Sequence, residues 1–206
     1  MHVLLINGSP HEKGCTYTAL SLVAGELNAV GITTEILNVG TKPVGGCIGC
    51  GGCAKGNGCV FGGVVNEAIE KARTADAFVF GTPVHYASAS GNMTSFLDRL
   101  AYAGGKYLAY KPAAICASAR RAGTTSALDQ LVKYPEFFHM PLVSGSYWPM
   151  VHGSNPEQVL QDEEGCAVMK ELGRNMAWLL QCIEAGKAAG ISHPENPRRP
   201  MTNFIR

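Results

Sequence analysis

Five short segments with the character of strands alternate along the chain with longer segments whose apolar residues recur at helical spacing. The first and third are apolar, as is typical of strands that are buried on both faces of a sheet, and the second is rich in β-branched residues. The five segments comprise residues 3–6, 33–39, 77–81, 113–117 and 141–144. Because helices separate these strands, the order predicts an α/β fold. We expect a doubly wound, five-stranded parallel sheet with strand order 2-1-3-4-5 and helices on both faces.

Composition limits the classes of protein that fit this chain. It has 206 residues, of which 46% are hydrophobic and 16% are charged, which suits one compact domain with a sizeable core. The net charge is +1, and scattered Lys and Arg residues give no sign of a nucleic-acid or membrane partner. The chain shows neither a signal peptide nor a membrane-spanning run, so we expect a cytoplasmic protein.

We therefore predict a single domain over residues 1–206. Two segments of this domain lack the strand and helix patterns. Residues 40–63 form a long glycine- and cysteine-rich loop, and a loop of this length in a compact domain is usually functional or disordered. From about residue 189 the chain is predicted to form an extended C-terminal tail.

The segment that joins the first strand to the first helix has the features of a phosphate-binding loop. Residues 6–16 read Ile-Asn-Gly-Ser-Pro-His-Glu-Lys-Gly-Cys-Thr, and a helix is predicted to begin near Thr16. Amide groups at a helix N-terminus attract anions, and Ser9 and Thr16 add hydroxyl donors. The Walker and Rossmann glycine patterns do not occur here. The loop suits a phosphate monoester, or its hydroxyl groups only cap the helix.

Two further loops are predicted to meet this one. Ligands of open parallel sheets bind beyond the carboxyl ends of the strands, where the winding reverses direction. With the predicted strand order, residues 83–93 and 118–125 join residues 9–16 at that edge. Tyr86 can stack on a flat ring there, and Gly91 allows close approach of the backbone. Alternatively, Tyr86 is a partly buried structural residue.

In combination, these segments resemble the flavodoxin-like NAD(P)H-dependent FMN reductases. The resemblance is carried by Gly8-Ser9-Pro10 through Gly14-Cys15-Thr16, and by Thr82-Pro83-Val84-His85-Tyr86 followed by Phe96-Leu97-Asp98-Arg99. It extends from Met1 to about Leu180 and implies a flavodoxin-like fold with bound FMN. The residues that it implies for FMN binding are Ser9, His11, Lys13, Cys15, Thr16, Pro83, Val84, His85, Tyr86, Gly91, Ser118, Arg120, Arg121 and Gly123.

Four cysteines in the long loop form a separate motif, Cys47-x-x-Cys50-x-x-Cys53-x5-Cys59. Three cysteines at three-residue steps can wrap one side of a [4Fe-4S] cluster, and Cys59 would then supply the fourth thiolate. Within the FMN reductases, this run resembles that of the iron–sulfur flavoproteins. Free or reversibly oxidised thiols and a zinc site remain alternatives, although zinc usually takes two separated C-x-x-C pairs.

The resemblance implies an FMN-dependent oxidoreductase that moves electrons from NADPH or NADH to a small-molecule or protein acceptor. We assign no catalytic side chain, because the flavin itself carries out hydride transfer. One alternative is an iron–sulfur flavoprotein electron carrier that uses FMN plus a [4Fe-4S] cluster, and another is a non-catalytic redox-sensing module. The resemblance also implies a homodimer or homotetramer.

Overall fold

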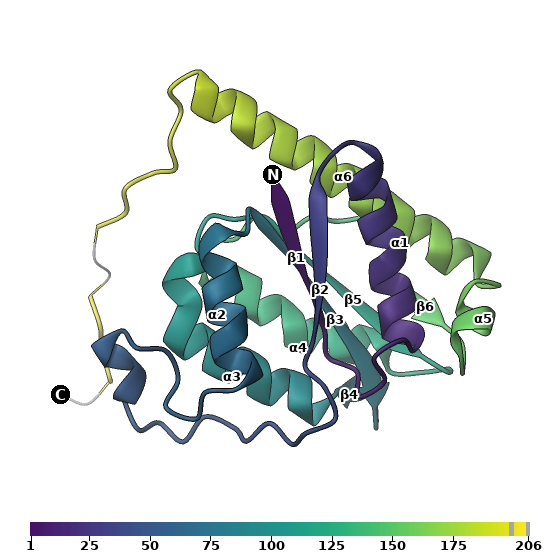
Figure 1. Ribbon diagram of the computed structural model, residues 1–206, viewed down its shortest axis with the longest axis horizontal. Coiled ribbons are helices and arrows are strands. Elements are labelled where there is room, and N and C mark those ends of the chain that lie inside the picture. The colour runs from purple at the N-terminus through teal and green to yellow at the C-terminus, as the bar shows by residue number, and fades with distance from the viewer. Residues whose placement is uncertain (198–199, 205–206) are drawn as a thin grey trace.

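The computed structural model describes residues 1–197 and 200–204 (Figure 1). The predicted tail also includes residues 198–199 and 205–206, which lie outside the described residues. The strands are β1 (His2–Asn7), β2 (Thr33–Asn38), β3 (Ala77–His85), β4 (Ser88–Ala89), β5 (Ala113–Ala119) and β6 (Met150–His152). The helices are α1 (Cys15–Ala29), α2 (Val64–Thr74), α3 (Gly91–Gly104), α4 (Thr124–Phe137), α5 (Pro156–Val159) and α6 (Glu163–Ala188), with short 3₁₀ turns η1 (Gly52–Lys55) and η2 (Gly105–Tyr107).

The main sheet is parallel, with strands in the order β2-β1-β3-β5-β6. Leu5 of β1 lies opposite Ile36 of β2 on one side and opposite Val79 of β3 on the other. This arrangement confirms the predicted doubly wound sheet and the predicted spatial order of its five parallel strands. The short strand β4 pairs antiparallel with β3, outside that series.

The position of the edge strand differs from the prediction. Residues 141–144 were expected to form it, but only Leu142 pairs with the sheet there, through a single bridge to Ala113. The paired strand β6 lies later in the chain, against the end of β5. Between them the chain leaves the sheet, because the Ser146 amide and hydroxyl both donate hydrogen bonds to the Glu171 carboxylate, at 2.9 and 2.6 Å. This contact with α6 interrupts the edge strand.

Strand β3 is longer than the apolar run that predicted it. The run ends at Gly81, but β3 continues to His85 and pairs with β4 through Val84–Ala89 and His85–Ser88 contacts. A tight hairpin therefore occupies part of the segment that was predicted as a loop. Pro83 is compatible with this extension because it lies near the end of the strand rather than at its centre.

Helices cover both faces of the sheet, as predicted. Alternate residues of a strand point to opposite faces. Leu4 and Phe80 pack with residues of α2, α3 and α4 in one core, whereas Leu5 and Val79 pack with residues of α1 and α6 in the other. Figure 1 shows the same division, with α1 and α6 adjacent to each other and apart from α2, α3 and α4.

Helix α6 has 26 residues and packs along α1. The approach is close at Gly173, where an added Cβ would lie 2.7 Å from the Val23 carbonyl oxygen. Gly186 lies two residues before the C-terminal end of α6 and has open surroundings, because an added Cβ there would lie 3.9 Å from its nearest neighbour, Ile191 Cβ. Among the described helices, including α6, none combines the length and the hydrophobicity needed to span a bilayer.

The two glycines of α6 provide a test of this helix packing. Gly173→Ala should lower the free energy of unfolding by about 1–3 kcal/mol, because its methyl group would push α6 away from α1. Gly186→Ala, in the same helix, should leave stability unchanged or raise it by up to about 1 kcal/mol through helix propensity. Urea denaturation followed by circular dichroism measures both changes. Equal stability of the two variants would contradict the packing described.

Candidate functional site

The loops that follow β1, β3 and β5 meet at the carboxyl edge of the sheet. The amide of Gly8 donates a hydrogen bond to the Gly81 carbonyl oxygen at 2.9 Å. The hydroxyl groups of Thr16 and Ser118 are hydrogen-bonded at 2.8 Å, although 102 positions separate them in the chain. The structure therefore brings together the three loops that the sequence placed at one edge.

The buried Asn7 side chain organises the first of these loops. Its Oδ1 accepts a hydrogen bond from the Ser9 amide at 3.1 Å, and its Nδ2 lies 3.3 Å from the carbonyl oxygens of His11 and Glu12. The same Nδ2 donates to Asn38 Oδ1 at 2.8 Å, which ties the loop to β2. Sequence reasoning did not assign Asn7 a role. A polar residue at the end of an apolar strand was the available signal.

The residues predicted to bind phosphate lie in this loop and in the first turn of α1. Ser9 and Thr16 are buried, Cys15 is half-buried, and His11 and Lys13 are exposed. The Cys15 thiol donates to the Gly153 carbonyl oxygen at 3.5 Å, and burial is the main cause that raises its pKa above the usual value. Cys15 is therefore a neutral thiol near pH 7. Among the described residues, no side chain caps the amide groups at the start of α1.

The second loop is the tight β3–β4 hairpin. Tyr86 and Ala87 form its turn with φ values of 49° and 59°, a region that non-glycine residues occupy rarely. The turn holds the Tyr86 side chain fully exposed to solvent. His85 is also exposed, whereas Pro83 and Val84 are half-buried. The hairpin thus presents an aromatic ring at the edge where the three loops meet.

The third loop contacts this hairpin at Gly123. The φ of Gly123 is +96°, and a Cβ added to this residue would lie 2.6 Å from Ala87 Cα and 2.9 Å from Val84 Cγ1. Ser118 is buried at the start of this loop, and the neighbouring Arg120 and Arg121 are both exposed. The predicted ring-binding residues of the two loops are therefore held against each other by backbone packing.

Helix α3 begins beside the same loops. The structure assigns the N-cap to Ser90, whose Oγ accepts from the Met93 amide at 3.2 Å and donates to the Gly8 carbonyl oxygen at 2.9 Å. Asn92 holds the cysteine loop, with its Nδ2 donating to the Lys42 carbonyl oxygen at 3.2 Å and its Oδ1 accepting from the Val44 amide at 3.1 Å. Gly91, between them, is exposed.

The four cysteines of the long loop line one cavity of about 250 Å³, together with Arg99 and Tyr102 of α3. Cys47 and Cys50 are exposed, Cys53 and Cys59 are half-buried, and all four are free thiols. Gly49 and Gly51 adopt φ values of 65° and 69° between the cysteines, which lets the backbone curl around the cavity. The donor set and its convergence on one space fit a thiolate-bound cluster.

In the described ranges, no group of three His, Cys, Asp or Glu side chains is already arranged around a position for a metal ion. The cysteines share a cavity without a preformed coordination geometry. The candidate ligands are the four cysteines that line this cavity.

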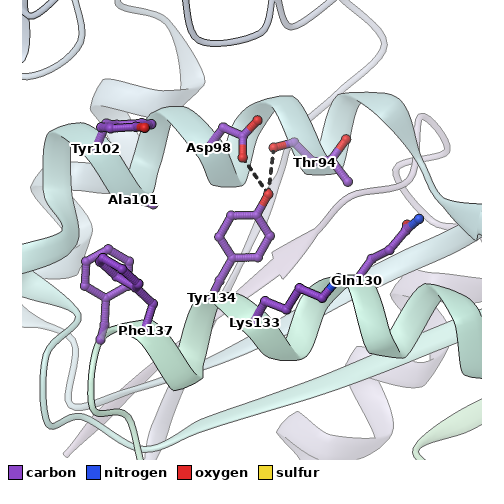
Figure 2. A pocket seen from close by; sticks show the side chains of 9 residues that line it. Thr94, Asp98, Ala101, Tyr102, Gln130, Lys133, Tyr134 and Phe137 are labelled. Carbon is purple, nitrogen blue, oxygen red and sulfur yellow. Dashed lines mark hydrogen bonds between the residues drawn. The ribbon is translucent and has the colours of Figure 1, made fainter. Parts of the chain in front are cut away.

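A separate groove of about 600 Å³ lies between α3 and α4 (Figure 2). Tyr134 crosses it, and its hydroxyl donates to Asp98 Oδ1 at 2.6 Å. Burial, followed by the hydrogen bond to Asp98, raises the pKa of Tyr134, so its phenol stays protonated. The groove contains none of the residues predicted to bind FMN or metal, but Tyr102 lines both this groove and the cysteine cavity.

The family model for NADPH-dependent FMN reductase matches residues 1–155, which include the three loops and the cysteine loop. The chain belongs to this FMN reductase family. Its fold is that of flavodoxins, as predicted.

Two relatives of this FMN reductase family member are named iron–sulfur flavoproteins. One, from Methanocaldococcus jannaschii, is 28% identical over 195 residues, which is 89% of this chain and 100% of the relative. Another, from Archaeoglobus fulgidus, is 30% identical over 175 residues, or 83% of this chain and 86% of the relative. The resemblance to iron–sulfur flavoproteins that the sequence suggested is confirmed.

Solved structures support the fold of this family member. An NADH:FMN oxidoreductase in its apo form matches with a TM-score of 0.61 and 20% identity, covering 88% of this chain and 89% of that one. An archaeal flavodoxin matches with a TM-score of 0.59 and 12% identity, covering 88% and 99%. At these identities the similarity establishes the flavodoxin-like fold alone.

The contact between the second and third loops can be tested with two glycines. Gly123→Ala should lower the free energy of unfolding by about 1–3 kcal/mol, because alanine disfavours positive φ and its methyl group would overlap Ala87. Gly91→Ala should change stability by less than about 0.5 kcal/mol, because an added Cβ there meets no atom within 4 Å. Thermal and urea unfolding provide the measurement. A Gly123→Ala variant as stable as the parent would contradict the close contact.

Proposed function

We propose that this chain is an FMN-dependent oxidoreductase that carries electrons from NADPH or NADH to a small-molecule or protein acceptor. The observation that carries the proposal is the meeting of the loops after β1, β3 and β5, in a chain that belongs to the FMN reductase family. Bound FMN would supply the hydride and electron chemistry. The side chains of this protein would then bind the cofactor and orient it.

The first loop is suited to the phosphate group of FMN. The uncapped amide groups at the start of α1 and the hydroxyls of Ser9 and Thr16 offer hydrogen-bond donors to an anion. The neutral Cys15 thiol adds no negative charge that would repel the phosphate. Lys13 and His11 are exposed beside the loop and can approach the phosphate from solvent.

The hairpin and the loop after β5 are suited to the isoalloxazine ring. Exposed Tyr86 offers an aromatic face for stacking, and the exposed end of β3 at His85 offers peptide groups for hydrogen bonding. Arg120 and Arg121 are exposed next to Ser118, where they can donate to the flavin pyrimidine or attract a nicotinamide phosphate. These roles are part of the proposal.

An anaerobic absorption spectrum tests this function directly. The purified chain, supplied with FMN, should be yellow and should bleach when NADPH or NADH is added without an acceptor. A colourless protein that does not take up FMN would contradict the proposal. Protein that binds FMN but is not reduced by either nicotinamide would instead support the redox-sensing module.

The role of Tyr86 can be measured separately from folding. Because the ring is fully exposed, Tyr86→Ala should leave the melting temperature unchanged. Loss of stacking should raise the dissociation constant for FMN about tenfold, or about 1.4 kcal/mol. Trp178→Ala, which removes an exposed aromatic side chain from α6, is the matched control and should bind FMN normally. Equal affinities of the two variants would contradict stacking by Tyr86.

A second candidate function is that of an electron carrier containing FMN and a [4Fe-4S] cluster. It is favoured by the single cavity that Cys47, Cys50, Cys53 and Cys59 share, and by relatives that are named iron–sulfur flavoproteins. Those four cysteines would hold the cluster, which would supply one-electron transfer. The two functions share the FMN site and differ in whether the cysteine loop takes part.

Iron content distinguishes these functions. After anaerobic reconstitution, the parent protein should contain about four irons per chain if the cluster forms. Cys50→Ser should lose most of this iron, because it removes one of four ligands. Cys182→Ser, at an exposed cysteine on α6 outside the loop, should retain it. Iron-free parent protein, or equal iron in both variants, would contradict the cluster at these cysteines.

A further inference from the structure

The side chain of Arg99 is buried and contacts the cysteine loop at three points. Only 6% of Arg99 is exposed. Its Nε donates to Cys59 Sγ at 3.2 Å, its Nη1 to the Gly45 carbonyl oxygen at 3.3 Å, and its Nη2 to the Gly62 carbonyl oxygen at 3.0 Å. The planar guanidinium group is suited to such simultaneous contacts. One side chain thus joins two distant parts of the loop to a cysteine sulfur.

The contacts of Arg99 indicate that the Cys59 sulfur carries the negative charge that compensates the guanidinium. A buried guanidinium is stabilised when a negative group compensates its charge. Two of its three hydrogen-bond acceptors are neutral peptide carbonyls, and the third is the Cys59 sulfur. Among these three partners, only the sulfur can carry a full negative charge, as a thiolate bound to a cluster does.

Cys59 is also held through its backbone. The Asn66 side chain of α2 accepts from the Cys59 amide at 2.8 Å and donates to the Cys59 carbonyl oxygen at 3.0 Å. Gly58 has a φ of +78° and packs against the side-chain amide of Asn66, where an added Cβ would lie 2.9 Å from Asn66 Oδ1. Cys59 is therefore fixed at its backbone by Asn66 and at its sulfur by Arg99, whereas Cys47 and Cys50 are exposed.

Helix α3 connects this contact to the FMN site. Its N-cap, Ser90, hydrogen-bonds the first loop through the Gly8 carbonyl oxygen. Asn92, two residues further along, holds the start of the cysteine loop at Lys42 and Val44. Arg99 follows nine residues after Ser90, or about 13 Å along the helix axis. A single rigid element therefore positions both the FMN loops and the cysteine loop.

We propose that Arg99 is a positioning residue that raises the reduction potential of an iron–sulfur cluster held by the cysteine loop. This inference rests on the second candidate function. Hydrogen bonds to the ligand sulfurs and nearby positive charge stabilise the reduced cluster, which carries more negative charge than the oxidised one. The Arg99 contact with Cys59 provides both effects in a water-poor environment, where they are stronger than at the surface.

The experiment is an anaerobic redox titration of the full-length, iron-reconstituted chain, followed by the EPR signal of the reduced cluster. Arg99→Gln removes the charge and the guanidinium fork. It should lower the equilibrium constant for one-electron reduction about tenfold, which is a shift of about 59 mV to lower potential. Arg99→Lys keeps the charge but loses the fork, so its shift should have the same direction and be smaller.

Lys55→Met is the control for net charge. It removes one positive charge from an exposed position within the cysteine loop, between Cys53 and Cys59. Water screens this charge, so the potential should move less than in Arg99→Gln. Equal shifts in Lys55→Met and Arg99→Gln, or an unchanged potential in Arg99→Gln, would overturn the assignment.

Iron and FMN content separate the remaining outcomes. If both Arg99 variants lose iron but keep FMN and normal helix content, Arg99 holds the cluster in place rather than setting its potential, and the inference fails. If both lose iron, FMN and helix content together, Arg99 supports only the fold and the inference fails. If the parent chain itself takes up no iron, the candidate cluster function fails, which is distinguishable from an iron-loaded variant with an unchanged potential.

Discussion

Parallel pairing of β1, β3 and β5 is the constraint on which the rest of the structure depends. Because these strands are neighbours and run in the same direction, the loops that follow them must emerge at one edge of the sheet. Residues that are far apart in sequence, such as Thr16 and Ser118, consequently share a hydrogen bond. The FMN site that we propose is a consequence of this topology.

A small polar network holds the loops in place once the strands have brought them together. Asn7 links the first loop to β2, and Ser90 links it to α3. Both side chains are buried and hydrogen-bonded, so each satisfies backbone groups that would otherwise be costly to bury. The network leaves Tyr86 and Arg120 exposed at the edge. The same helix α3 then carries Arg99 to the cysteine loop, which joins two candidate redox sites through one element.

Local pattern in the sequence was enough to predict much of this fold. Strands β1, β3 and β5 coincide with apolar runs, because strands buried on both faces must be apolar throughout. The edge strand β2 is only partly buried and was predicted from its β-branched residues. The edge strand after β5 was misplaced because its position depends on Glu171, which holds Ser146 from a distant helix. The cap of α3 also depends on contacts that are distant in the sequence. Ser90 and Asn92 are both good caps by residue type, and only their tertiary partners distinguish them.

The candidate site shows the same limit. Spacing alone indicated that four cysteines act together, and they do line one cavity. The contact between Arg99 and Cys59 spans 40 positions and follows from no local pattern. Asn7 likewise acquires its role from the loop that folds back onto it.

The most direct test of the account is a crystal structure of the chain with FMN bound. We predict the phosphate within the loop of residues 9–16 and the isoalloxazine ring between the hairpin at Tyr86 and the loop of residues 118–123. FMN bound away from the carboxyl edge of β1, β3 and β5, or in the groove between α3 and α4, would contradict it.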